Sequence, residues 1–359
     1  MNTRIFYIII LFFLIFKSQG QMSNEEKTLT DSLFNDKKEI YFSFDIASRN
    51  EIQVITNTVS ISNIKGSKVF AYANKKEFEK FIPLNKEYII LPHPGSVNKN
   101  PEMTNFSSFK EIAEWNAYPT YSAYESMMNQ FSVDHPELCK TYTIKTLSSG
   151  RKLMLVKISA NVNTHENEPQ FLYTSSMHGN ETSGYVLMLR LIDTLLTNYG
   201  TNARITNLLD NIELWVCPLA NPDGTFEASG GSSIAGAIRG NANGVDLNRN
   251  YPDPVAGNHA DGEVWQPETQ AFMGLADTMS FVMSCNFHEG AEVVNYPWDT
   301  KSALTADNNW WLLVSGEYAD TAQYFGPSNY FTYPEPFGIT NGYAWYQVQG
   351  GRQDYMNYF

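Results

Sequence analysis

Apolar and polar positions alternate along this chain with two periods, which predict strands and helices in turn. The apolar run that begins at Phe171 predicts a buried strand that breaks at His178-Gly179. Apolar residues at helical spacing follow from Val186 to Leu196 and predict a helix. The stretch between them therefore predicts a tight turn from strand to helix. Open α/β sheets bind their ligands at such turns, beyond the carboxyl ends of the strands.

The same alternation continues on both sides of this stretch, from residue 118 onward. A helix is predicted over 121–131, with Thr120 or Ser122 as its cap. Further strands are predicted over 142–146, 153–158, 212–219 and 280–287. Strands that alternate with helices favour an α/β fold, with a mixed, mostly parallel sheet covered by helices on both faces.

Residues 21–98 predict a small separate α/β module. Its strands are expected over 40–46, 68–72 and 87–91, and its helices over 51–59 and 75–81. The run from Pro92 to Pro101 breaks structure, and a linker is expected over 99–117. His93 lies between two prolines there and is interpreted as a solvated loop histidine. The module carries no cluster of catalytic groups, so a pro-segment, a chaperone-like leader and an accessory domain are all open roles.

Residues 1–20 predict a secretory signal peptide. Arg4 precedes the almost wholly apolar run 5–16, and small residues follow at Ser18 and Gly20. The run is too short for a membrane-spanning helix, so a secreted, periplasmic or cell-surface protein is expected. The net charge of −13 and the lack of a basic run argue against nucleic acid as a partner. No second hydrophobic span is present, so stable membrane insertion is not expected.

Composition and cysteine spacing narrow the class further. A hydrophobic content of 43% and a charged content of 18% are typical of a folded globular chain and exclude a disordered one. Cys139, Cys217 and Cys285 form no Cys-x-x-Cys pair, which argues against a cysteine-rich structural zinc site. Buried free thiols are favoured over one disulfide with one free thiol.

Candidate chemistry gathers at the predicted turn after the first strand. His178 and Glu181 supply an imidazole and a carboxylate that can converge on one ion, and a catalytic zinc takes three protein ligands and a water. His288 directly follows the strand predicted over 280–287 and is the candidate third ligand. On its own, such a histidine is more often a satisfied core residue. The polar loop 239–252 lies between these sites and carries two arginines, which suit a carboxylate, although a solvated loop fits the same run.

Six stretches of the chain resemble the zinc metallocarboxypeptidases in that family's order. They are closer to its carboxypeptidase N/E branch than to its pancreatic A/B branch. They are Tyr118–Tyr121, Met177–Glu181, Asn221–Gly224, Gly244–Pro252, Asn286–His288 with Asn295–Asp299, and Gly338–Asp354. Each stretch alone is weak to moderate evidence, but six in order are specific. The resemblance covers residues 118–359, the expected carboxypeptidase domain, and leaves out the N-terminal module.

The resemblance implies roles for individual residues. His178, Glu181 and His288 would hold one Zn²⁺, and Arg239 would polarise the scissile carbonyl and stabilise the oxyanion. The implied substrate-binding residues are Asn248 and Arg249 at the terminal carboxylate, Tyr346 as a closing hydrogen-bond donor, Asp299 on the pocket wall and Gln353 at its floor. Peptide and protein C-termini are the implied substrates, and an acid in the pocket favours a C-terminal Lys or Arg.

The chain departs from the family's pattern at two points that bear on activity. The family's general-base glutamate is expected about one strand beyond Asp354, past residue 359. The chain is therefore expected to be C-terminally incomplete and inactive as it stands. Glu289 also follows His288 where the family usually has glycine. Two hypotheses remain: a secreted zinc carboxypeptidase, and a non-catalytic module that binds zinc and peptide C-termini. Nothing in the chain favours cell-wall peptides over other peptides as the substrate.

Overall fold

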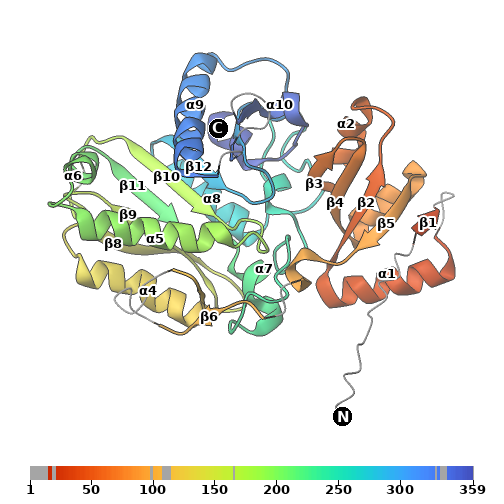
Figure 1. Ribbon diagram of the computed structural model, residues 1–359, viewed down its shortest axis with the longest axis horizontal. Coiled ribbons are helices and arrows are strands. Elements are labelled where there is room, and N and C mark those ends of the chain that lie inside the picture. The colour runs from red at the N-terminus through yellow and green to blue at the C-terminus, as the bar shows by residue number, and fades with distance from the viewer. Residues whose placement is uncertain are drawn as a thin grey trace, which may run out of the picture.

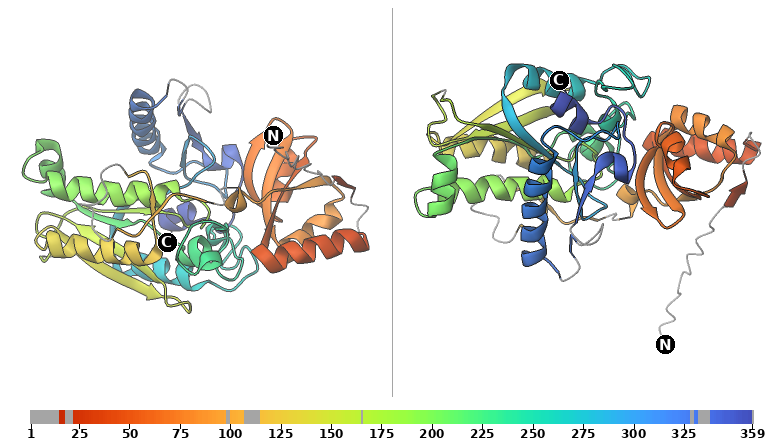
Figure 2. Two further views of the ribbon diagram at one scale, coloured as in Figure 1. Left: turned by 60° about the horizontal axis from the view of Figure 1, so that its bottom comes forward. Right: turned by 90° about the horizontal axis from the view of Figure 1, so that it is seen from above.

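The computed structural model describes residues 15–17, 22–97, 100–106, 115–164, 166–327, 330–331 and 338–358. An N-terminal module lies beside a larger domain, and the same arrangement is seen from two further directions (Figures 1 and 2). Of the segment predicted to be a signal peptide, only β1 (Ile15–Lys17) is among the described residues. It pairs antiparallel with β5 (Glu87–Leu91).

The N-terminal module is a five-stranded antiparallel sheet with the order β1-β5-β2-β4-β3. Its other strands and its helices are β2 (Glu39–Asp45), β3 (Ser60–Lys65), β4 (Lys68–Asn74), α1 (Asn24–Lys37), α2 (Asn50–Thr56) and α3 (Lys75–Phe81). Buried aromatic rings pack edge to face in its core, with Phe42 against Phe78 and Phe81, and Phe78 against Tyr88. The three strands and two helices predicted here are present, whereas α1 and β3 were not predicted.

The larger domain is built on a five-stranded mixed sheet with the order β12-β10-β11-β9-β8. Its strands are β8 (Cys139–Thr146), β9 (Lys152–Ile158), β10 (Gln170–Ser175), β11 (Glu213–Cys217) and β12 (Phe281–Phe287). β10 lies in the middle of the parallel part, between β11 and β12. β9 pairs antiparallel with both β11 and β8. The expected mixed sheet is confirmed, and its parallel strands all end at one edge.

Helices cover both faces of this sheet, as expected (Figure 1). One face packs on α4 (Tyr121–Asp134), α5 (Ser183–Asn198) and α6 (Ala203–Leu209), and the other on α8 (Pro267–Thr278) and α11 (Arg352–Tyr358). The alternation in β9 decides which side chain goes where: Met154 and Val156 join the first core, and Leu153 and Leu155 the second.

Further elements complete the domain. They are β6 (Met103–Thr104), β7 (Tyr118–Pro119), α7 (Pro222–Phe226), β13 (Val294–Tyr296), α9 (Asn308–Phe325), β14 (Ile339–Asn341) and α10 (Gly342–Trp345). The predicted linker over 99–117 contains β6, which pairs with β7, and residues 107–114 of it lie outside the described part. The three cysteines are free thiols, as favoured. No helix in the described ranges has the length and apolar character needed to cross a bilayer.

Candidate active site

The two parallel strands β10 and β12 bring the predicted metal ligands together. They pair in register up to Ser175 and Phe287, so His178 and His288 follow at the same edge. Nδ1 of His178 lies 3.1 Å from Nδ1 of His288, and each of these nitrogens lies 2.8 Å from an oxygen of Glu181. One donor atom from each side chain therefore lies within 4.8 Å of the other two. We call His178, Glu181 and His288 the donor cluster.

This donor cluster fits zinc. Two imidazoles and one carboxylate are a common catalytic zinc set that leaves a fourth position for water. Zinc bonds of about 2.0–2.1 Å place the ligand atoms of a tetrahedral site roughly 3.3 Å apart, close to the spacing seen here. The donor atoms need only small shifts to surround the ion.

Tight backbone packing shapes the loop that carries two of the donors. Ser176 has a φ of 53°, and its hydroxyl donates to the carbonyl of Glu181 at 2.8 Å. Gly179 is required, because a Cβ there would lie 2.3 Å from the carbonyl carbon of Gly224. Asn221 holds the opposite turn by donating to the carbonyl of Met177. The Asn221–Gly224 motif, at the start of α7, thus packs against the loop that carries His178 and Glu181.

Asp246 supports the donor cluster, and no role was predicted for it. One oxygen lies 3.0 Å from Nε2 of His178, and the other accepts from Nε of Arg239 at 3.0 Å. A carboxylate behind a metal-binding histidine fixes the orientation and tautomer of the ring. Asp246 lies within Gly244–Pro252, one of the resembling stretches, and that position was the available signal.

Charges within the donor cluster shift the pKa values of its members. Burial raises the pKa of Glu181, but His178 and His288 outweigh it and hold the pKa well below its ordinary value. Desolvation lowers the pKa of His288. Burial and Arg239 act to lower the pKa of His178, but Glu181 and Asp246 outweigh them and raise it. Glu181 is therefore an ionised oxygen donor at neutral pH.

Arg239 lies where a carbonyl-polarising group is expected. Its guanidinium donates to Glu181 at 3.2 Å as well as to Asp246, and the side chain is buried. Burial alone would lower its pKa, but Asp246 and Glu181 outweigh burial and raise the pKa further. The residue is thus a fixed positive charge beside the donor cluster.

The predicted carboxylate-binding pair lies on one turn, Leu247–Arg249, directly after Asp246. The side-chain oxygen of Asn248 accepts from the backbone N–H of Arg352 at 3.0 Å. One terminal nitrogen of Arg249 donates to the carbonyl of Asn248 at 2.8 Å. Its Nε and other terminal nitrogen are buried, and neither has a hydrogen-bond partner among the described residues. A buried guanidinium with free donors is a ready site for a carboxylate.

The two residues predicted for the side-chain pocket, Asp299 and Gln353, lie in contact. Oδ1 of Asp299 accepts from Gln353 at 2.9 Å and from Asn295 at 3.2 Å. Burial and the neighbouring carboxylate of Asp354 raise the pKa of Asp299 above its ordinary value. Asp354 in turn accepts from the backbone N–H groups of Asp299 and Thr300. Asp299 is thus held in place by a second buried acid.

Tyr346 lies between the pocket and the N-terminal module. Burial raises the pKa of its phenol, while Arg249 and Arg239 are near enough to lower it. The ring also packs against the aromatic core of the N-terminal module. Tyr346 therefore lies near both arginines, and the N-terminal module packs against its ring.

The N-terminal module sits directly on the candidate site. The carboxylate of Glu39 accepts from the backbone N–H groups of Arg239 and Gly240, at 2.6 and 2.9 Å. The ring of Tyr72 covers the guanidinium of Arg239, 5.4 Å from ring centroid to guanidinium carbon, and its hydroxyl accepts from Asn180 at 2.8 Å. Ser60 donates to Asp246 at 2.6 Å. Sequence reasoning missed these contacts because no motif marks them.

His93 packs within the module, against two residues that contact the larger domain, and its interpretation as a solvated loop histidine was wrong. Nε2 lies 2.8 Å from Glu39, Nδ1 accepts from the backbone N–H of Gly95, and the ring packs edge to face on Tyr72. Although it lies between two prolines, the ring contacts Glu39 of β2 and Tyr72 of β4.

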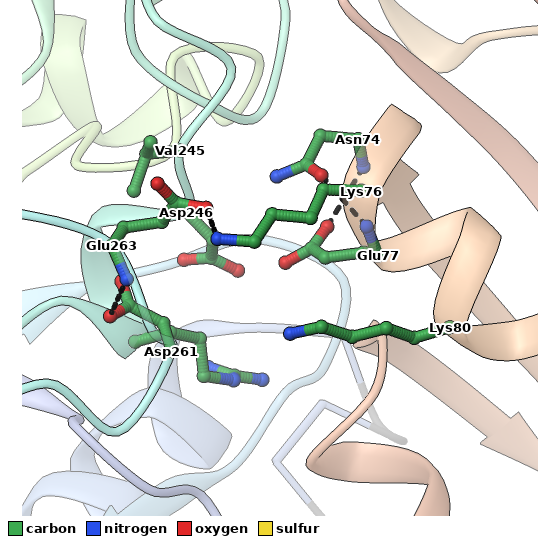
Figure 3. A pocket seen from close by; sticks show the side chains of 9 residues that line it. Asn74, Lys76, Glu77, Lys80, Val245, Asp246, Asp261 and Glu263 are labelled. Atoms are coloured by element: carbon green, nitrogen blue, oxygen red, sulfur yellow. Dashed lines mark hydrogen bonds and ion pairs between the residues drawn. The ribbon is translucent and has the colours of Figure 1, made fainter.

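A pocket lies at the interface of the module with the larger domain, between α3 and the loop around Asp246 (Figure 3). Lys76 of the module reaches across to Glu263 at 2.6 Å, and Lys80 points towards Asp261. Burial raises the pKa of Glu77, also in this wall, to about 8. Arg249 also lines the pocket. The arginine that was predicted to bind a carboxylate thus lies against the module.

Comparison with known proteins agrees with this geometry. The profile of the zinc carboxypeptidase family matches residues 124–359. Human carboxypeptidase D is 36% identical over 247 residues, which are 64% of this chain and 17% of that protein. Mouse carboxypeptidase M is 32% identical, over 64% of this chain and 54% of that protein. Carboxypeptidase E of Caenorhabditis elegans is 32% identical, over 69% and 61%. The chain thus spans less than two thirds of each of these relatives.

Solved structures share the fold at low sequence identity. Carboxypeptidase A from Helicoverpa armigera superimposes with a TM-score of 0.66 at 16% identity, over 89% of this chain and 86% of that one. Thrombin activatable fibrinolysis inhibitor gives a TM-score of 0.62 at 14% identity, over 89% and 88%. Residues from 118 onward make up about two thirds of this chain, so these likenesses extend into the N-terminal module. From its family profile and its mixed α/β fold, this chain belongs to the zinc carboxypeptidase family.

Proposed function

We propose that this protein hydrolyses the C-terminal peptide bond of peptides and proteins, with one zinc ion held by His178, Glu181 and His288. The observation that carries the proposal is the position of the donor cluster. It lies beside the fixed charge of Arg239, and a partly unpartnered Arg249 follows on the next turn. A metal site, a charge for the oxyanion and a site for a terminal carboxylate are three of the parts that such an exopeptidase needs, besides a general base.

Each side chain then has a physical task. Zinc, when bound, supplies Lewis acidity and a water of lowered pKa. Asp246 holds the ring of His178 through Nε2 and holds Arg239 through its other oxygen. Arg239 offers a guanidinium to negative charge that develops on the carbonyl oxygen. Arg249 and Asn248 bind the terminal carboxylate of the substrate, and the phenol of Tyr346 closes over it.

We further propose that the N-terminal module is a pro-segment that keeps the cleft closed. It covers Arg239 with Tyr72, packs on Tyr346 and walls in Arg249. A substrate that must reach these three residues cannot bind while the module is docked. The domain limits proposed are residues 21–98 for the module, 99–117 for the linker and 118–359 for the carboxypeptidase domain. Secretion after removal of residues 1–20 is part of the same proposal, and the N-terminal sequence of protein recovered from the medium would check it.

Arg249→Ala tests the carboxypeptidase assignment. Zinc-loaded protein should bind a peptide with a free C-terminal carboxylate at least about tenfold more weakly after this change, because a charge-assisted pair is lost. A peptide with an amidated C-terminus should bind equally to both proteins. Both proteins carry Glu39→Arg, which is expected to open the cleft, and Arg190→Ala on the exposed face of α5 is the matched control. Equal loss for both peptides would contradict the carboxylate role.

A preference for C-terminal Lys or Arg is proposed from Asp299. Because its pKa is raised, Asp299 is partly protonated when no substrate is bound. Asp299 must lose this proton before it can pair with a cationic side chain. Affinity for a peptide ending in lysine should therefore rise between about pH 5.5 and about pH 8.5, while affinity for one ending in leucine stays flat. Asp299→Asn should remove the rise and lower the preference about tenfold. Asp277→Asn, on α8, should change neither, and a rise that survives Asp299→Asn would refute this role.

A second candidate is a module that binds zinc and a peptide C-terminus without turnover. This candidate is favoured because, in the described part of the chain, the carboxylates at the donor cluster are already engaged by other groups. Glu181 is a donor, Asp246 is tied to His178 and Arg239, and Glu289 accepts from the backbone N–H of Ser183, so each of these carboxylates is already engaged. On this reading the chain, residues 1–359, is inactive by itself. Zinc-loaded protein that binds the peptide but leaves it intact would favour this candidate, and release of the C-terminal residue would exclude it.

A further inference from the structure

Glu289 joins the two segments that carry the metal donors. Its side-chain Oε1 accepts from the backbone N–H of Ser183, the first residue of α5, 106 positions away in the sequence. Its own backbone N–H donates to Oε2 of Glu181 at 3.3 Å. One residue therefore contacts a donor through its main chain and the helix behind that donor through its side chain.

The N-terminus of α5 is not capped by the side chain of the residue that precedes it. The residue before it, Thr182, makes no side-chain capping bond, and the first turn contains no acidic residue. The first four N–H groups of a helix have no partner within it, and a carboxylate there is favourable for hydrogen bonding and for the helix dipole. Glu289 supplies this carboxylate from the loop after β12.

We infer that Glu289 is a positioning residue of the metal site, which caps α5 from the His288 loop and thereby holds Glu181 against His288. The inference rests on the proposed zinc site. Glu181 lies only two residues before Ser183, so a fixed Ser183 leaves the Glu181 side chain little freedom. Without this link the two loops must be ordered by the ion itself, which weakens binding.

Two other roles for Glu289 predict different behaviour. A fourth metal ligand or a proton acceptor needs the negative charge, whereas a cap needs only an oxygen that accepts from Ser183. Glutamine keeps that oxygen and removes the charge, alanine removes both, and aspartate keeps the charge on a side chain one methylene shorter.

The test is the zinc dissociation constant of the full chain, measured by competition with a chromophoric chelator. Glu289→Ala should weaken zinc binding roughly tenfold, whereas Glu289→Gln should remain within about threefold of the parent. The control is Asn202→Ala, which removes the cap of α6, where Asn202 accepts from the N–H groups of Arg204 and Ile205. It should lower the melting temperature of the apo-protein and leave zinc affinity unchanged. If Glu289→Ala does not fold, Glu289→Asp replaces it, with the same expected loss.

Parental affinity in Glu289→Ala, or equal losses in the glutamine and alanine variants, would overturn the capping role. His178→Ala in the same titration separates the two proposals. If it still binds zinc at parental affinity, the zinc site itself is misassigned. If it loses zinc while Glu289→Ala keeps it, only the role of Glu289 fails.

Discussion

Replacing His178 by alanine is expected to remove zinc from the protein. The ring supplies one of the three donor atoms, and Asp246 holds it in place through Nε2. Two remaining donors hold zinc weakly in competition with water and buffer, and the cavity left behind would also place Glu181 beside Asp246 without the imidazole between them. Zinc content after dialysis, measured by atomic absorption, should fall from about one per chain to below about a tenth.

His259→Ala is the matched control for this experiment. His259 is exposed, contacts Trp265 and the carbonyl of Glu263, and lies outside the donor cluster. It should keep its zinc. Stoichiometric zinc in His178→Ala would show that the ion binds elsewhere and would remove the basis of the proposed enzyme.

Reversing the charge at Glu39 is expected to open the cleft. The carboxylate accepts two backbone hydrogen bonds from the larger domain and is almost wholly buried, and hydrogen bonds to a charged group contribute roughly 1.5–3 kcal/mol each. Glu39→Arg removes both and places a second guanidinium beside Arg239. A peptide with a free C-terminus should then bind zinc-loaded protein at least about tenfold more tightly, as isothermal titration calorimetry can measure.

Glu79→Arg provides the comparison for this charge reversal. Glu79 lies on the exposed side of α3 in the same module, so the net charge changes equally without touching the interface. It should leave peptide affinity at the parental value. If Glu39→Arg also leaves it unchanged while circular dichroism shows a folded protein, the module does not limit access to the cleft.

The fold was largely predictable because its strands are short apolar runs with clear breaks. The strand at 171, the helix after it and the module's three predicted strands are all present. Helix α1 was missed although Ser23 and Glu26 form a capping box, because its interior is mostly polar. Strand β3 was missed because its buried residues are few, so neither period stands out.

Only part of the candidate site could be predicted from the sequence. The three donors could be predicted because each lies directly after a strand or before a helix, and the resemblance added the substrate residues. The contacts of Glu39 and Tyr72 with the larger domain could not, because they depend on how the module docks, and single side chains in a strand carry no pattern for that. Asp246 and Glu289 were visible as residues, but their tasks depend on which atoms they face.

The segment after His93 is part of the packed structure and not a free tether. The N–H of Gly236 donates to the carbonyl of Gly95 at 2.7 Å, and a Cβ on Gly95 would meet the carbonyl oxygen of Ala237. A peptidase that cuts beyond this point would sever the chain while Glu39, Tyr72 and Ser60 still hold the module in place. Cleavage of the chain and dissociation of the module would then be separate events. The cleaved protein would remain inactive until the module dissociates. The delay before activity would be set by the lifetime of that complex.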